Sequence, residues 1–156
     1  MPEPISLKRL LSTLSKKRQS GKKIVFTNGC FDILHVGHVR YLEQAKSLGD
    51  VLVVGLNSDA SVRKLKGPGR PVNPEKDRGA VIAALKSVDF VTVFKEETPL
   101  KLIGAVKPDV LVKGGDWKPQ DIIGSKFVLS HGGQVRSLKF VQGRSTSKVL
   151  AAIASL

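Results

Sequence analysis

Cysteine is almost absent from this chain of 156 residues, and so are the sequence features of membrane and secreted proteins. The single cysteine, Cys30, excludes an internal disulfide and fits a reducing compartment. No apolar run approaches the ~18 residues that span a bilayer. Residues 1–20 also lack the apolar core and small-residue cleavage site of a secretory signal. We therefore expect a cytoplasmic protein without a membrane partner.

Several well-known catalytic motifs are also missing. The chain has no GxGxxG dinucleotide fingerprint and no Walker loop ending in Gly-Lys-Ser/Thr. No Ser-His-Asp arrangement and no nucleophile flanked by a base is favoured. No Cys, His or carboxylate cluster completes a metal site around the closely spaced histidines, so none of the side chains is predicted to hold a metal. These absences favour chemistry in which the protein supplies positioning and charge stabilisation rather than a covalent intermediate.

Acidic residues are scarce, since 13 Asp and Glu face 26 Lys and Arg and the net charge is +13. Such a balance points to a polyanionic partner. The basic residues are scattered, and the one Trp, one Tyr and six Phe form no RNP-type aromatic strand. A nucleoside triphosphate drawn into a cleft would account for the charge equally well. A basic nucleic-acid-binding module remains the alternative from a different functional class.

Apolar, β-branched runs alternate with segments of helical spacing, which predicts an α/β fold. We expect a first strand from Ile24, and further strands at residues 51–56, 90–94, 109–113 and 135–140. Helices are expected within residues 1–21, from the histidines at 35 and 38 to Gly49, and from 73 or 74 through 87. In the last of these, Val81, Ile82 and Leu85 should face inward. Three more helices are expected to begin at Thr98-Pro99, to end before Gly132-Gly133, and to run from the caps at 145–147 to 154. Residues 63–71 read as a basic, glycine-rich loop that carries Lys66. This alternation predicts a doubly wound parallel sheet with helices on both faces. We divide the chain into an N-terminal amphipathic helical extension, residues 1–21, and a single domain, residues 22–156.

The most informative stretch joins the first strand to the helix after it. A strand leads through Asn28 and Gly29, where left-handed backbone angles cost little, into His35 and His38. The two histidines would lie one turn apart at a helix start, where free backbone N–H groups and the helix dipole favour phosphate.

This stretch, Thr27-Asn28-Gly29-Cys30-Phe31-Asp32 followed by His35-Val36-Gly37-His38, resembles the signature of the Rossmann-like nucleotidyltransferase superfamily that includes the cytidylyltransferases. The resemblance implies five strands in the order 3-2-1-4-5. It implies catalytic roles for His35, His38 and Lys66, in which each donates hydrogen bonds to phosphate oxygens during attack on the α-phosphorus. It also implies a nucleotide site made of Thr27, Asn28, Gly29, Cys30, Phe31, Gly37, Lys113, Gly114, Gly115, Phe140, Gly143, Arg144, Ser145 and Thr146.

Three longer stretches, residues 53–63, 66–73 and 108–117, are similar to D-glycero-β-D-manno-heptose 1-phosphate adenylyltransferases. That group implies ATP as donor, Mg²⁺ arriving with ATP, ADP-heptose and pyrophosphate as products, a role in lipopolysaccharide core synthesis, and a homodimer. We expect the sugar phosphate to be bound by Asp32, Asn57, Asp59, Arg78, Asp116 and Trp117. Phe140 replaces the arginine that cytidylyltransferases tend to carry before their last helix, which weakens a reading as a glycerol-phosphate enzyme. Cytidylyl or adenylyl transfer to another small phosphate, such as glycerol 3-phosphate, remains the alternative within the enzyme class.

Overall fold

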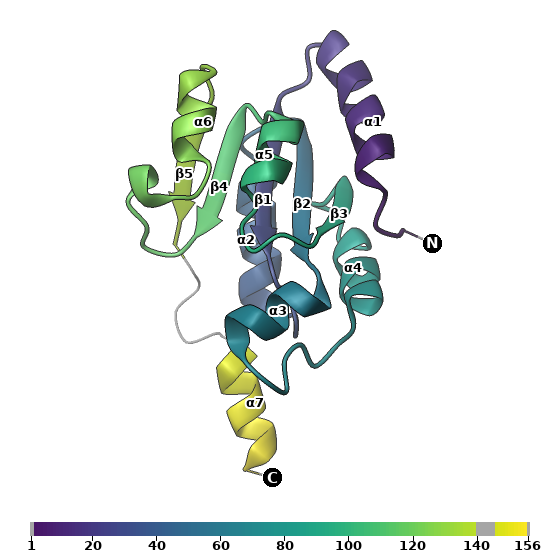
Figure 1. Ribbon diagram of the computed structural model, residues 1–156, viewed down its shortest axis with the longest axis vertical. Helices are drawn as coiled ribbons and strands as arrows, with labels where there is room; N and C mark the ends of the chain where they lie inside the picture. The colour runs from purple at the N-terminus through teal and green to yellow at the C-terminus, as the bar shows by residue number, and fades with distance from the viewer. Residues whose placement is uncertain (1, 140–145, 156) are drawn as a thin grey trace.

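Five parallel strands form one sheet in the order β3-β2-β1-β4-β5 (Figure 1). The computed structural model describes residues 2–139 and 146–155. The strands are β1 (Ile24–Gly29), β2 (Val51–Asn57), β3 (Phe90–Phe94), β4 (Val110–Gly114) and β5 (Gln134–Leu138). At the centre, Phe26 of β1 lies opposite Val53 of β2 on one side and Leu111 of β4 on the other. The expected Rossmann-like fold and strand order are confirmed.

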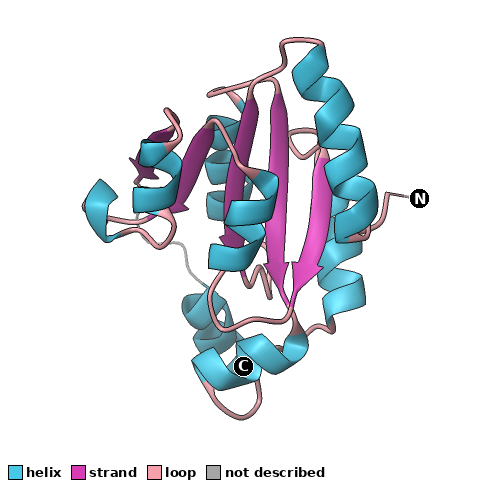
Figure 2. Cartoon of the chain, turned by 45° about the horizontal axis from the view of Figure 1, so that its top comes forward, coloured by secondary structure: helices cyan, strands magenta, loops and turns pink. Residues whose placement is uncertain are grey.

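Helices cover both faces of this sheet (Figures 1 and 2). Along β1 and β2 consecutive side chains alternate between two cores, as the pleat of a strand requires. The core with Phe26 and Val53 is completed by α1 (Leu7–Gln19), α5 (Leu100–Val106) and α6 (Ser125–Ser130). The opposite core, with Val25 and Leu52, is completed by α2 (Val36–Lys46) and α4 (Glu75–Ala83). The remaining helical segments are α3 (Asp59–Lys66), the 3-10 turn η1 (Pro119–Asp121) and α7 (Thr146–Ala154).

The first helix belongs to the packing of the sheet. Ser6 caps α1 by accepting a hydrogen bond from the backbone N–H of Arg9 at 3.3 Å. Leu10 and Leu14 are completely buried in the same core as the central strands. Arg18 donates to backbone carbonyls at the end of α5. Among the described residues, no helix is both long and apolar enough to cross a bilayer.

Three local predictions were wrong. Residues 63–66 are not loop but the last turn of α3, which Ser58 caps through the N–H of Ser61 at 3.2 Å. An eight-residue helix with few buried positions leaves no clear apolar period, so the basic residues hid it. In α4, Val81 is 52% exposed, because Arg78, Gly79 and Ile82 form the buried side. Pro99 is the N-cap of α5 rather than its first residue.

Candidate active site

A cavity of about 370 Å³ opens where β1, β2 and β4 end. In open parallel sheets, ligands bind beyond the carboxyl ends of the strands, where the winding reverses. The winding reverses here between β1 and β4. The cavity is lined by Asn28, Gly29, Cys30, Phe31, Asp32, His38, Tyr41, Asn57, Leu65, Lys66, Arg70, Glu97, Pro99, Lys113, Gly114, Ile123 and Thr146.

The chain leaves β1 through a turn that folds back over the strand end. Phe31 adopts a φ of 43°, in the left-handed region that few side chains tolerate. A Cβ atom on Gly29 would lie 2.9 Å from the Phe31 ring, so the close approach requires glycine. The Phe31 ring in turn meets His38 edge to face, with centroids 5.4 Å apart. The turn therefore fixes the position of His38.

The two histidines occupy different positions at the start of α2. His35 is the N-cap, and its Nδ1 accepts a hydrogen bond from the N–H of Gly37 at 3.1 Å. His38 lies in the first turn, and its ring stacks on that of His35 with centroids 3.9 Å apart. His38 lines the cavity, whereas His35 does not belong to the lining. The structure thus brings the pair together but exposes one imidazole to the cavity.

His38 is neutral at physiological pH. Burial, then the neighbouring His35 and Lys66, lower the pKa of its imidazole to about 4. Its Nδ1 is buried and has no hydrogen-bond partner within residues 2–139 and 146–155. A neutral imidazole carries one N–H donor and one acceptor. The ring can therefore donate a hydrogen bond to an anion without a permanent charge of its own.

Among the described residues, three cations line the same cavity: Lys66 at the end of α3, Arg70 after it, and Lys113 in β4. Burial lowers the pKa of Lys113. Burial also raises the pKa of the Cys30 thiol, although Lys66, Arg78, Lys113 and Arg70 oppose the rise. Cys30 is therefore a protonated wall residue at neutral pH rather than a thiolate nucleophile. The cavity suits an anion with several charges.

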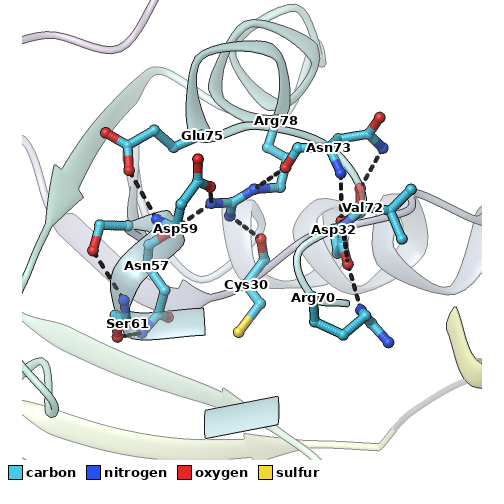
Figure 3. A network of polar contacts seen from close by, with 11 residues as sticks. Cys30, Asp32, Asn57, Asp59, Ser61, Arg70, Val72, Asn73, Glu75 and Arg78 are labelled. Carbon is cyan, nitrogen blue, oxygen red and sulfur yellow. Dashed lines mark hydrogen bonds and ion pairs between the residues drawn. The ribbon is translucent and has the colours of Figure 1, made fainter. Parts of the chain in front are cut away.

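Asp32 joins the turn after β1 to the loop before α4 (Figure 3). Its carboxylate accepts hydrogen bonds from Arg70 Nε at 2.6 Å, from the Val72 N–H at 2.8 Å and from the Asn73 N–H at 3.0 Å. Burial would raise the pKa of this carboxyl, but the backbone donors of Asn73 and Val72, together with Arg70, lower it below its usual value. Asp32 borders the cavity as an ionised carboxylate whose oxygens already hold protein donors.

Arg78 is an internal side chain, only 2% exposed, and each of its guanidinium nitrogens has a protein acceptor. Its guanidinium donates to the carbonyls of Asn73, Cys30 and Asn57 and pairs with Asp59 Oδ1 at 2.7 Å (Figure 3). Neither Arg78 nor Asp59 lines the cavity. The geometry gives this pair the task of fixing the ends of β1 and β2. The sugar-phosphate contact expected of both residues stays a prediction.

The other predicted site residues are distributed around this centre. Thr27 is buried and shares a hydrogen bond of 2.6 Å with the Tyr41 hydroxyl, and Gly37 is buried in α2. Gly115 and Asp116 follow β4 without lining the cavity, and Trp117 lines an adjoining cavity of about 250 Å³. Thr146 at the start of α7 lines the main cavity and donates to the Ile33 carbonyl at 3.2 Å. Four predicted residues lie outside the described part of the chain: Phe140, Gly143, Arg144 and Ser145.

Several lining residues were not predicted from the sequence. Arg70, Glu97 and Pro99 come from loops. For Tyr41, Leu65 and Ile123, the spacing of residues in the sequence did not show that they line the cavity. For Arg70 a signal existed, because an arginine in a loop rich in Gly and Pro beside Lys66 can reach a phosphate. For the others the sequence offers no signal that we can identify.

Comparison with known proteins agrees with this geometry. The family model described as cytidylyltransferase-like matches residues 26–150. The bifunctional protein HldE of Photobacterium profundum is 58% identical over 92% of this chain, and that of Syntrophotalea carbinolica is 54% identical over 92%. The chain spans only about 30% of the length of these relatives. The crystal structure of the lipopolysaccharide core biosynthesis protein from Thermoplasma volcanium is 31% identical, with a TM-score of 0.63 over 80% of this chain and 100% of that one.

Proposed function

The chain belongs to the cytidylyltransferase-like family, and from this premise we propose that it transfers AMP from ATP to D-glycero-β-D-manno-heptose 1-phosphate. The products are ADP-heptose and pyrophosphate, for lipopolysaccharide core synthesis. One observation carries the proposal: His38, Lys66, Lys113 and Thr146, from four separate elements, line one cavity at the reversal point of the sheet. The names of the relatives, bifunctional protein HldE and lipopolysaccharide core biosynthesis protein, support the choice of substrate.

The reaction needs positioning and charge stabilisation. A phosphate oxygen of the heptose 1-phosphate attacks the α-phosphorus of ATP, a new P–O bond forms, and the bond to the bridging oxygen of pyrophosphate breaks. Negative charge spreads over the phosphate oxygens in the transition state. The neutral His38 donates a hydrogen bond to this charge, while Lys66 and Lys113 neutralise it. The buried, unpaired Nδ1 of His38 fits a side chain whose polar contacts are completed by a ligand.

A magnesium ion would arrive on the triphosphate instead of being held by carboxylates of the protein. Within the described residues, no group of three or more His, Cys, Asp or Glu could hold a metal. Asp32 is committed to Arg70, Val72 and Asn73. Mg²⁺ commonly keeps several waters and binds through substrate phosphates, where it neutralises part of their charge.

A pyrophosphate-release assay tests the proposal. The purified protein is mixed with ATP or CTP, each with heptose 1-phosphate or glycerol 3-phosphate, in the presence of Mg²⁺. We expect rapid release of pyrophosphate and formation of ADP-heptose with ATP and heptose 1-phosphate. Faster turnover of CTP with glycerol 3-phosphate, or a salt-sensitive nucleic-acid shift without any pyrophosphate, would contradict the proposal. Light scattering of the same sample tests whether it is a homodimer.

A further inference from the structure

Arg70 lines the cavity, and among the described residues its hydrogen-bonding capacity is only partly used. Its Nε donates to Asp32 Oδ2 at 2.6 Å, and its side chain is 17% exposed at the cavity wall. Within residues 2–139 and 146–155, no hydrogen bond or ion pair engages its two terminal nitrogens, Nη1 and Nη2. Figure 3 shows these nitrogens turned away from Asp32. Part of the guanidinium is therefore left for a ligand.

The backbone after Arg70 is held by Asp32. Asp32 also accepts from the N–H groups of Val72 and Asn73, and the Asn73 side chain donates back to the Asp32 carbonyl at 2.9 Å. Before Arg70, Gly67 and Gly69 take φ values of 86° and 82°, which a glycine adopts without strain. The guanidinium is thus oriented before any ligand arrives, which reduces the entropy lost on binding.

Arg78 shows how an arginine behaves in this fold when each of its guanidinium nitrogens bonds to the protein. Its guanidinium is buried, and Nε, Nη1 and Nη2 all have protein acceptors. Arg70 instead uses Nε for the protein and leaves the planar pair of terminal nitrogens at the cavity. A guanidinium presents this pair in a geometry that matches two oxygens of a phosphate.

We propose that Arg70 is a phosphate-binding residue whose terminal nitrogens form a bidentate pair with a phosphate group in the cavity. Asp32 is the positioning residue that holds Arg70 through Nε. The proposal rests on the proposed function for the source of that phosphate. The phosphate belongs either to ATP or to the sugar phosphate, and the experiment separates the two.

The test variant is Arg70→Gln. The side-chain nitrogen of glutamine stands at the same number of bonds from the backbone as Nε of arginine, so it can still donate to Asp32. The substitution removes the two terminal nitrogens, Nη1 and Nη2. Arg63→Gln is the matched control, because Arg63 lies exposed on α3 outside the cavity and the charge change is identical. Pyrophosphate release is followed with ATP varied at saturating heptose 1-phosphate, and then the reverse.

We expect Arg70→Gln to raise the KM of one of the two substrates by about 10- to 100-fold, the size of one charge-assisted hydrogen-bonding pair. A rise for ATP assigns the triphosphate, and a rise for heptose 1-phosphate assigns the acceptor. Arg63→Gln should leave both values unchanged. If Arg70→Gln matches Arg63→Gln in both KM values and in kcat, the proposal is wrong. If Arg70→Gln does not fold, Arg70→Lys replaces it: a rise in the KM of either substrate supports the proposal, and unchanged kinetics overturn it.

Asp32 is tested through Arg70. If Asp32 acts by holding the guanidinium, Asp32→Asn raises the KM of the same substrate as Arg70→Gln, and the double variant adds less than the product of the two effects. Fully multiplicative effects would show that Asp32 does not act through Arg70.

Failure of the proposed function gives a different result. If the wild-type protein releases no pyrophosphate with any substrate pair, the proposed function fails, and the Arg70 proposal is then judged by calorimetry with inorganic pyrophosphate. Weaker binding by Arg70→Gln than by Arg63→Gln supports the proposal, and equal binding overturns it.

Discussion

At the scale of single residues, burial gives His38 its chemical character. The imidazole is stacked on His35, met by the edge of Phe31 and exposed to the cavity. Burial and nearby positive charge keep the imidazole neutral. It can therefore donate a hydrogen bond to a phosphate without adding another positive charge beside the lysines. We propose that it contributes when charge develops in the transition state.

Replacing His38 tests this contribution. His38→Ala should lower kcat for pyrophosphate release by about 10²- to 10³-fold, by analogy with the loss of one oxyanion-hole donor. His131→Ala is the control, because His131 is exposed at the end of α6 and outside the cavity. Near-normal turnover of His38→Ala would show that the imidazole does not take part in the reaction.

The lowered pKa of His38 also predicts how stability depends on pH. In the unfolded chain this group takes up a proton below about pH 6.5, whereas in the folded protein its pKa is about 4. The unfolded state therefore binds more protons between these values, and the free energy of unfolding falls as pH is lowered from 6.5 toward 4. Urea unfolding at pH 7 and pH 4.5 should show a larger loss for wild type than for His38→Gln. Equal losses would mean that the imidazole titrates normally in the fold.

At the scale of elements, Arg78 links the ends of β1 and β2 to the start of α4. It does so through three carbonyls and the Asp59 carboxylate, at a position where the first turn and the following loop form the cavity wall. The apolar pattern could not reveal this, because the buried side of α4 contains an arginine and a glycine.

Arg78→Met keeps an unbranched side chain as far as the position of Nε and removes every donor. It should lower the free energy of unfolding by about 3–5 kcal/mol, because an uncompensated carboxylate and unpaired carbonyls remain. Urea denaturation measures this, with the exposed Arg63→Met expected to stay within about 0.5 kcal/mol of wild type. A loss below about 1 kcal/mol for Arg78→Met would contradict the linking role.

The packing of α5 on β2 predicts opposite effects for two glycines. A Cβ atom on Gly55 would lie 2.8 Å from Phe26 Cζ and 3.0 Å from Leu102 Cδ2, so Gly55→Ala should destabilise by about 1–3 kcal/mol. Gly104 lies in α5 with open space around it, and Gly104→Ala should stabilise by up to about 1 kcal/mol. Thermal unfolding of the two variants measures both effects. Shifts of the same sign would show that the packing differs from that described.

Strands were easier to predict than helices in this chain. The run at residues 90–94 became β3 without change, because continuous β-branched and aromatic residues admit few alternatives. The helix α3 was missed because its signals are a cap and one buried valine. The ion pair of Asp32 and Arg70 was also missed: the two residues stand 38 positions apart, and no local pattern shows that they meet.

At the scale of the whole molecule, the net charge of +13 acts over distance. A positive surface draws a polyanion toward the cleft, and salt screens this attraction over about 10 Å at 0.1 M. We expect kcat/KM for ATP to fall between 50 and 400 mM NaCl while kcat changes little. Steady-state kinetics across this range measure the effect. A kcat/KM that does not depend on salt would show that the positive charge does not draw ATP to the cavity and only keeps the surface solvated.

The fold class and the place of the candidate cavity could be predicted from the chain, since strand order and the end of β1 define where the winding reverses. The division into residues 1–21 and 22–156 stays a prediction. The sequence could not show which of the two imidazoles lines the cavity. That depends on His35 being the N-cap of α2, which follows from the local backbone geometry.

The most direct measurement is a crystal structure of the protein with magnesium and a non-hydrolysable ATP analogue. Our account predicts the triphosphate in the cavity of about 370 Å³, within hydrogen-bonding distance of His38 and Lys66 and beside Lys113. A triphosphate bound elsewhere, with His38 and both lysines free of contact, would contradict it.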